Sequence, residues 1–187
     1  VYKRQGAYAW LDGDGKEAFR TATRHLLDLG HQRIMHLAAP SAFTFATLRR
    51  EGYEKEMLGA GLIPCTTETI ADSEPAFNVA LEILSKKERP TAILCATDKM
   101  AYGVLKAARD LGLSIPRDLS VIGHDNLPAS SRTEPALTTM ELPLTDAGAR
   151  LANLLLHAIK APEPKPSLDI LPVRFIERAS TAPPFHQ

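Results

Sequence analysis

Residues 90–126 constrain the fold of this chain more than any other stretch. Two short apolar runs, 91–96 and 119–123, enclose a segment whose apolar residues recur at the spacing of a helix packed on one face. A strand, a helix and a strand joined by short turns make a βαβ unit, and the two strands of such a unit run parallel. The pattern therefore predicts a parallel sheet with a helix packed against it.

The same alternation of apolar runs and helical stripes extends back toward the amino end. We expect strands at 8–11, 34–38 and 67–71, and helices at 17–29, 45–60 and 75–86. A glycine follows three of the predicted helices, in the position where glycine commonly ends a helix: Gly30, Gly61 and Gly112. Alternating strands and helices predict an α/β fold in which helices flank a parallel sheet.

The regular alternation ends after residue 126. We expect a strand at 137–140, a helix at 146–160, a proline-rich linker at 161–167, a final strand at 168–176 and a loosely attached segment at 181–187. The 146–160 helix carries leucines and alanines in a wide apolar stripe, and loops separate it from the repeating unit on both sides. It needs a packing partner, which predicts a second lobe that is incomplete in this chain.

The composition is that of a globular protein without a strong charge. Lys plus Arg and Asp plus Glu number 22 each, which leaves no basic footprint for nucleic acid or an anionic membrane. No apolar run is long enough to span a bilayer, and no apolar signal sequence opens the chain. The two cysteines, Cys65 and Cys95, predict a reduced, cytoplasmic protein. The chain begins with Val1, so we expect the natural amino terminus to lie further upstream.

Polar side chains follow both strands of the 90–126 unit. Thr97 and Asp98 come after the first strand, and His124, Asp125 and Asn126 come after the second. Ligands bind beyond the carboxyl ends of the strands in an open parallel sheet, so we expect the functional site there. Asp98 can alternatively cap the next helix. Asp125 can accept two hydrogen bonds from a polyol or a heterocycle, or can form a turn.

Two arginines and two phenylalanines form another candidate group. Arg49 and Arg50 lie in the predicted 45–60 helix, where one is expected to be solvated and the other can use its planar guanidinium on ligand hydroxyls or a carboxylate. Phe43 and Phe45 stand at the start of this helix. They can stack on a ring of a ligand or cover the edge of the domain.

Asp12 and Asp14 follow the first predicted strand and offer a different chemistry. Their spacing resembles the nucleophile and acid of haloacid-dehalogenase-type phosphatases, which also need a downstream lysine and an acidic metal pair. Asp125 alone does not supply that pair. No nucleotide-binding, nucleophile-elbow or metal-ligand motif occurs, so we expect no cofactor, no metal and no catalysis.

Six stretches that occur in a fixed order resemble one known family. They are HLLDLGHQRI at 25–34, RREGY at 49–53, PTAILCATDKMAYG at 90–103, DLSVIGHDN at 118–126, PALTT at 135–139 and LPVRFIERAST at 171–181. Together they resemble the effector-binding domain of LacI/GalR-type transcriptional regulators, which shares its fold with periplasmic sugar-binding proteins. The resemblance covers residues 7–181, and it implies a periplasmic-binding-protein-like lobe together with part of a second lobe.

The resemblance implies a division of the chain between the two lobes, with a small ligand between them. Residues 12–140 and 168–178 would form the carboxyl-terminal lobe. The 145–160 helix would belong to the amino-terminal lobe, whose leading part would be absent, as would the helix-turn-helix DNA-binding head. Residues 182–187 would be a tail.

The resemblance also implies roles for individual residues. Arg49 would bind ligand hydroxyls or a carboxylate, and Asp125 would accept hydrogen bonds from the ligand. Asp98 would support the site from behind. The remaining pocket residues would be Thr97, Phe43 and Phe45. The homodimer contact would be formed by Tyr102, Ser130, Ser131 and Thr133.

Departures from the family pattern bear on the ligand. Ala71 stands near a position where an aromatic pocket residue is common, so stacking on a sugar ring from that side is not expected. His124 stands where many family members have a tyrosine. Phe43 and Phe45 stand where many relatives have polar residues, which suggests a less polar ligand.

These residues predict the ligand-sensing domain of a LacI-type DNA-binding transcriptional regulator. It would bind a sugar, a nucleoside or a similar effector between its lobes, act as a homodimer and contact operator DNA through the absent head. The alternatives are a periplasmic sugar-binding protein and a metal-dependent phosphatase that uses Asp12 and Asp14. A signal peptide upstream would favour the first alternative, and magnesium-dependent hydrolysis lost in Asp12→Asn would favour the second.

Overall fold

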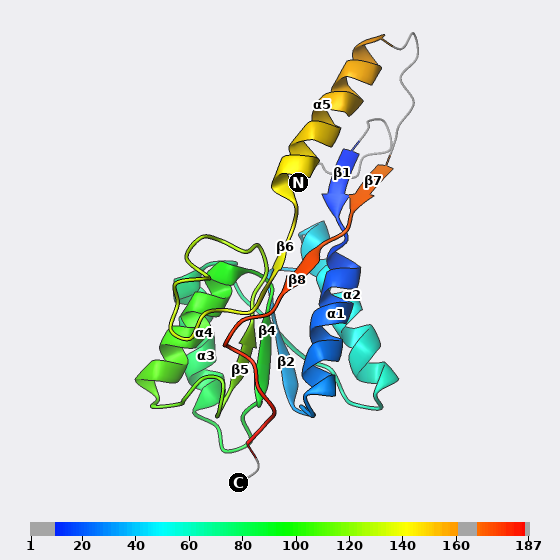
Figure 1. The fold of residues 1–187 in the computed structure, drawn as a ribbon. Coiled ribbons are helices and arrows are strands. Elements are labelled where there is room, and N and C mark those ends of the chain that lie inside the picture. Colours follow the sequence, from blue (N-terminus) through cyan, green and yellow to red (C-terminus); the bar gives the residue numbers. More distant parts are fainter. Residues whose placement is uncertain (1–9, 161–167, 186–187) are drawn as a thin grey trace.

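The computed structural model describes residues 10–160 and 168–185. Its centre is a four-stranded parallel sheet in the order β3-β2-β4-β5 (Figure 1). The strands are β2 (Ile34–Ala38), β3 (Cys65–Glu68), β4 (Ala92–Cys95) and β5 (Ser120–Ile122). The predicted parallel sheet is thus confirmed.

Helices cover both faces of this sheet. α1 (Gly15–Asp28) and α2 (Thr44–Gly59) pack on one face, and α3 (Ser73–Leu84) and α4 (Asp98–Asp110) pack on the other. Successive side chains of a strand point to opposite faces, so Leu94 packs with the first helix pair while Ile93 and Cys95 pack with the second. The α/β fold with flanking helices follows directly from this alternation.

Local polar contacts and glycines set where the helices begin and end. The Asp14 side chain accepts a hydrogen bond of 2.9 Å from the Glu17 N–H, so α1 begins at Gly15, two residues before its predicted start. The three predicted glycines adopt positive φ angles after α1, α2 and α4, which confirms their role in ending these helices: Gly30, Gly61 and Gly112.

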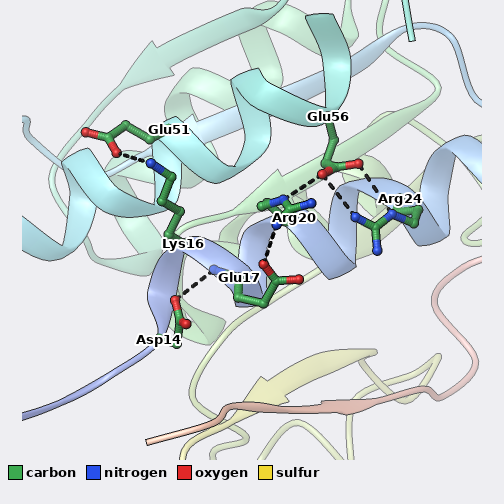
Figure 2. Close-up of polar contacts among 7 residues, drawn as sticks. All are labelled: Asp14, Lys16, Glu17, Arg20, Arg24, Glu51 and Glu56. Atoms are coloured by element: carbon green, nitrogen blue, oxygen red, sulfur yellow. Dashed lines mark hydrogen bonds and ion pairs between the residues drawn. The ribbon is translucent and has the colours of Figure 1, made fainter. Parts of the chain in front are cut away.

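Ion pairs join α1 to α2 along their solvent edge, as Figure 2 shows. Lys16 lies 2.8 Å from Glu51, and Arg20 and Arg24 both reach Glu56, at 2.7 and 3.0 Å. Beneath these pairs, a Cβ atom added to Gly52 would lie 2.2 Å from the Lys16 carbonyl oxygen. Only glycine permits this approach of the two backbones, which places the middle of α2 against the first turn of α1.

β3 begins earlier than its predicted position at 67–71. The Tyr53 hydroxyl donates to the Cys65 carbonyl at 3.1 Å and accepts from the Cys65 N–H at 2.8 Å. This side chain anchors the chain at Cys65, a long-range contact that local strand patterns do not reveal.

The remaining strands form two small sheets outside the central one. β1 (Trp10–Gly13) pairs with β7 (Leu168–Leu171) in parallel, and β6 (Thr139–Glu141) pairs with β8 (Arg174–Ile176) in antiparallel. The single strand predicted at 168–176 is therefore wrong, because two strands lie there. Pro172 lies between them and has no N–H to donate to a ladder.

α5 (Leu144–Lys160) projects away from the central sheet beside β1 and β7 (Figure 1). Ala147 is its buried residue, whereas four large apolar side chains are 48–71% exposed: Leu151, Leu155, Leu156 and Ile159. The apolar stripe predicted for this helix is thus present and uncovered. The assignment of this helix to a second lobe stays a prediction. No helix in the described ranges is long and apolar enough to cross a membrane.

The segment after β8 is more tightly held than predicted. The Val121 N–H donates to the Ser180 carbonyl at 2.8 Å, and the Ser180 hydroxyl donates to the Val121 carbonyl at 2.6 Å. The Ala182 carbonyl lies 2.9 Å from His31 Nε2. The predicted loose attachment is therefore wrong for residues 181–182, because this segment bonds to β5 and its neighbours. Residues 186–187 and the predicted 161–167 linker lie outside the described residues.

Candidate functional site

A cavity of about 400 Å³ lies at the carboxyl ends of the central strands. Its lining comes from the residues after β1, β4 and β5, from the first turns of α2, and from the segments that lead to α5 and β8. Four of the predicted site residues meet here: Arg49, Asp125, Thr97 and Phe45. The remaining lining residues are Asp12, Gly13, Gly15, Leu48, His124, Leu127, Leu142, Leu144 and Val173. A volume of this size suits a small molecule.

Arg49 is the cationic group of this cavity. Its Nη1 donates to the Ala96 carbonyl at the end of β4, and its guanidinium carbon lies 4.8 Å from the centre of the Phe45 ring. Burial lowers the pKa of Arg49 to about 10, although the nearby carboxylates of Asp125 and Asp12 oppose this shift. The guanidinium is therefore largely desolvated and remains charged at neutral pH, ready to donate to an anion or a hydroxyl. Arg50 instead forms ion pairs with Glu54 and Glu68, which confirms that one of the two arginines is a surface residue.

His124 and Asp125 form a hydrogen-bonded pair beside Arg49. His124 Nδ1 lies 2.9 Å from Asp125 Oδ1, and because a carboxylate only accepts, the imidazole carries its proton on Nδ1. Burial, followed by the charge of Arg49, lowers the pKa of His124, so its ring is neutral at pH 7. Nε2 is buried and has no hydrogen-bond partner among the described residues. The pair fixes one oxygen of the Asp125 carboxylate, whose side chain is 39% exposed.

The backbone at Asp125 is strained. Asp125 has a φ angle of 123° and Asn126 one of 50°, a region that L-amino acids rarely adopt. Neighbouring groups hold this conformation: the Asp125 N–H donates to the Met140 carbonyl at 2.8 Å, and the Asn126 side chain bonds to Glu141 at 2.9 Å and to Arg178 at 2.6 Å. The strain turns the Asp125 carboxylate toward the cavity instead of continuing β5.

Asp98 lies behind the cavity and does not line it. The carboxylate is fully buried and accepts three hydrogen bonds, from the Leu127 N–H at 2.8 Å and from the hydroxyls of Ser130 and Thr139 at 2.5 Å. The N-cap of α4 is Thr97, whose hydroxyl accepts from the Met100 N–H, so the interpretation of Asp98 as the cap is wrong. Asp98 instead links the start of α4 to the 127–130 loop and to β6.

The two phenylalanines divide between the cavity and the surface. Phe45 lines the cavity, whereas Phe43 is 37% exposed and does not line it. Their rings stack with centres 5.6 Å apart, so Phe43 supports Phe45 from outside.

The apolar wall of the cavity was not predicted from the sequence. Leu142 and Leu144 lie just before the predicted start of the 146–160 helix, and Val173 lies within the predicted 168–176 strand, where no rule pointed to a ligand site. Asp12 was assigned to phosphatase chemistry and instead lines the same cavity. A signal for Asp12 was available, because it follows a predicted strand as Thr97 and Asp125 do.

The phosphatase interpretation gains no support from the arrangement of the acidic residues. Asp14 caps α1. Within the described ranges, no three His, Cys, Asp or Glu side chains come together as a metal-binding group.

The four residues predicted for a dimer contact are not equally accessible. Ser130 is fully buried and bonds to Asp98 and, at 2.8 Å, to the Tyr102 hydroxyl, so its side chain cannot reach a partner and this part of the prediction is wrong. Tyr102 and Thr133 are half-buried and Ser131 is exposed. For these three residues the dimer contact stays a prediction.

A parallel sheet with polar side chains around a cavity at its carboxyl ends is the arrangement of an α/β ligand-binding protein. Residues 23–181 match the model of the periplasmic binding protein-like domain. The chain belongs to this family, in its LacI/GalR branch of transcriptional regulators.

The chain is similar to characterised members of that branch. The HTH-type transcriptional repressor PurR of Glaesserella parasuis serovar 5 (strain SH0165) is 36% identical over 154 residues, which are 81% of this chain and 45% of that protein. The crystal structure of a LacI family transcriptional regulator from Enterococcus faecium with bound ribose has a TM-score of 0.87 and 31% identity, covering 97% of this chain and 68% of that chain. The crystal structure of the lac repressor dimer bound to operator and an anti-inducer has a TM-score of 0.88 and 30% identity, covering 95% of this chain and 62% of that chain.

The chain spans about half the length of the curated relatives that it matches.

Proposed function

We propose that this chain is the effector-binding part of a cytoplasmic LacI-type transcriptional regulator, which binds a small molecule and catalyses no reaction. The observation that carries the proposal is the convergence of Arg49, Thr97 and Asp125 from three different elements on one cavity. A guanidinium, a hydroxyl and a carboxylate offer both donors and acceptors to a ligand that carries hydroxyl groups. The apolar wall favours an effector with a ring or an apolar face, such as a sugar or a nucleoside.

The position of the cavity supports a mechanism of lobe closure. Arg49 lies in α2 on one face of the central sheet, and Thr97 and Asp125 follow β4 and β5. On the other side of the cavity, Leu142 precedes α5, Leu144 begins it, and Val173 lies between β7 and β8. A ligand that contacts both sides binds the closed arrangement more tightly and so shifts the population toward it. In a homodimer, closure would change the spacing of two DNA-binding heads, and effector and operator affinities would be coupled reciprocally.

The proposed division of the chain places residues 12–140 and 168–178 in one lobe and the 145–160 helix in the other. The exposed leucines of α5 support this division, because such a face needs a covering surface that the central sheet does not supply.

The test is a ligand screen on the full-length protein followed by a titration of variants. Pentoses, hexoses, polyols and nucleosides would be screened by thermal shift, since a specific ligand raises the melting temperature by mass action. Asp125→Asn should lower the affinity for the ligand so found by about tenfold or more, because hydrogen bonds to a charged group are lost. Asp28→Asn, at an exposed position at the end of α1, is the matched control and should change nothing.

Two results would contradict the proposal. Unchanged affinity in both Asp125→Asn and Arg49→Gln would place the effector elsewhere. The effector must also change the affinity of the full-length protein for an operator obtained by in vitro selection, and an effector without this influence would refute the regulatory role.

A further inference from the structure

A second cavity lies at the other end of the central sheet, where the strands begin. Its volume is about 350 Å³. Arg33 lies directly before β2, Arg89 and Thr91 lie before β4, and Asp118 lies before β5. This second cavity shares no lining residue with the cavity that contains Arg49, called the effector cavity below. Its volume is that of a small-molecule site.

The lining of this second cavity is strongly basic. It contains three cationic side chains, Arg33, Lys87 and Arg89, and in the described part of the chain none of the three forms an ion pair. The carboxylate of Asp118 is already engaged, because it accepts from the Ser114 N–H at 2.8 Å and lies 3.5 Å from Arg117. Positive charge on this lining is therefore not compensated within the described residues, although the whole chain is neutral.

One of the arginines is oriented for binding. Arg33 Nε donates to the Arg89 carbonyl at 3.2 Å, and this is the hydrogen bond that its guanidinium makes among the described residues. The two terminal nitrogens remain available as a planar fork, which matches two oxygens of a phosphate group. Arg33 is exposed, so this hydrogen bond orients the guanidinium without burying it.

The carboxyl-terminal segment forms an apolar wall for this cavity. Pro184 and Phe185 contribute to the lining, and the guanidinium carbon of Arg117 lies 5.1 Å from the centre of the Phe185 ring. The hydrogen bond from His31 to the Ala182 carbonyl holds this segment against the sheet. A fourth cation is thereby kept near the rim of the cavity.

We propose that the cavity formed by Arg33, Lys87, Arg89 and Phe185 is a second ligand site, which binds a small phosphorylated compound with at least two negative charges. Cations without an ion pair in the described part of the chain, a guanidinium with two available nitrogens and a partly open cavity of this size are features that recognise a phosphate group. The site lies at the opposite end of the strands from the effector cavity, so one molecule can hold both ligands at once. This assignment does not depend on the identity of the effector.

The experiment uses inorganic pyrophosphate as the probe and the full-length protein at constant ionic strength. Isothermal titration calorimetry should show one saturable site per chain. Arg33→Gln combined with Lys87→Gln should weaken pyrophosphate binding by about tenfold or more, and Arg33→Lys, which keeps the charge but loses the fork, by about fivefold. The matched control removes two charges from exposed positions elsewhere, in Lys55→Gln combined with Arg109→Gln, and should bind as the unaltered protein does.

Three outcomes would overturn the assignment. The first is the absence of saturable binding. The second is equal weakening in the control, which would show general electrostatic attraction. The third is loss of pyrophosphate binding in Arg49→Gln, which would place the probe in the effector cavity. The melting temperature of each variant is measured alongside, and Arg33→Lys alone decides the question if the double variant does not fold.

Discussion

The buried carboxylate of Asp98 gives the most direct test of how the site is held together. Asp98→Asn keeps the size and shape of the side chain but removes its negative charge. With the amide oxygen in the place of Oδ2, it still accepts from the Leu127 N–H and the Ser130 hydroxyl, whereas the amide NH2 takes the place of Oδ1 and the Thr139 hydroxyl must turn to accept from it. A hydrogen bond to a charged group contributes about 1.5–3 kcal/mol and a neutral one about 0.5–1.5 kcal/mol, so each bond loses about 1 kcal/mol. The three together predict that the free energy of unfolding falls by about 3 kcal/mol.

Urea denaturation of Asp98→Asn measures this change. Asp110→Asn is the matched control, since its carboxylate is exposed and pairs only with Lys106 on the same helix, and it should cost less than about 0.5 kcal/mol. Because Asp98 also positions Leu127 in the cavity wall, effector affinity should fall as well. A loss of stability no larger than that of the control would refute the view that this carboxylate ties the strand ends together.

Three further predictions concern packing, pH and strain. Gly103→Ala should lower the free energy of unfolding by about 2 kcal/mol, because its Cβ would lie 2.3 Å from the Ser73 carbonyl oxygen. In the same urea titration the control Gly59→Ala, whose Cβ has no atom within 4 Å, should leave the free energy of unfolding unchanged or slightly raise it. Burial lowers the pKa of His36 to about 4, so between about pH 6.5 and 4 the unfolded state binds a proton that the folded state does not. The free energy of unfolding should therefore fall by about 2 kcal/mol from pH 7 to pH 5. His36→Gln should reduce this loss when urea denaturation is measured at both pH values. Asp125→Gly should be about 1 kcal/mol more stable than Asp125→Ala, because both variants lose the carboxylate and its bond to His124 but only glycine adopts φ 123° without strain. Both should abolish effector binding, and equal stability of the two variants in calorimetry would contradict this account.

The architecture could be predicted from the sequence because its signals are local. The apolar runs around Ile93 and Val121 and the stripe of α4 are short-range patterns, and parallel pairing follows from the way βαβ units connect. That Thr97 and Asp125 lie together followed from one further rule, that the carboxyl ends of parallel strands share an edge, whereas Arg49 was singled out from Arg50 only by the family resemblance.

The parts that could not be predicted depend on contacts between distant residues. Asp98 was open to interpretation as a helix cap because its true partners, Leu127 and Thr139, lie 29 and 41 positions away. The attachment of Ala182 to His31 spans 151 positions and involves a backbone carbonyl, which leaves no mark on the sequence. The apolar wall at Leu142 and Val173 depends on how the segments around α5 and β8 fold back over the ends of the central strands, which no local pattern indicates.

Three short passages of chain connect the central sheet with the projecting part, between β1 and α1, between β6 and α5, and between β7 and β8. A single flexible linker would let α5 with β1 and β7 rotate in any direction relative to the central sheet. Three connecting segments permit bending about one axis and oppose twisting. Ligand binding would then produce a hinge motion of one defined direction. A proline at an exposed position in one of the three connecting segments would restrict this motion without altering the residues that line the cavity.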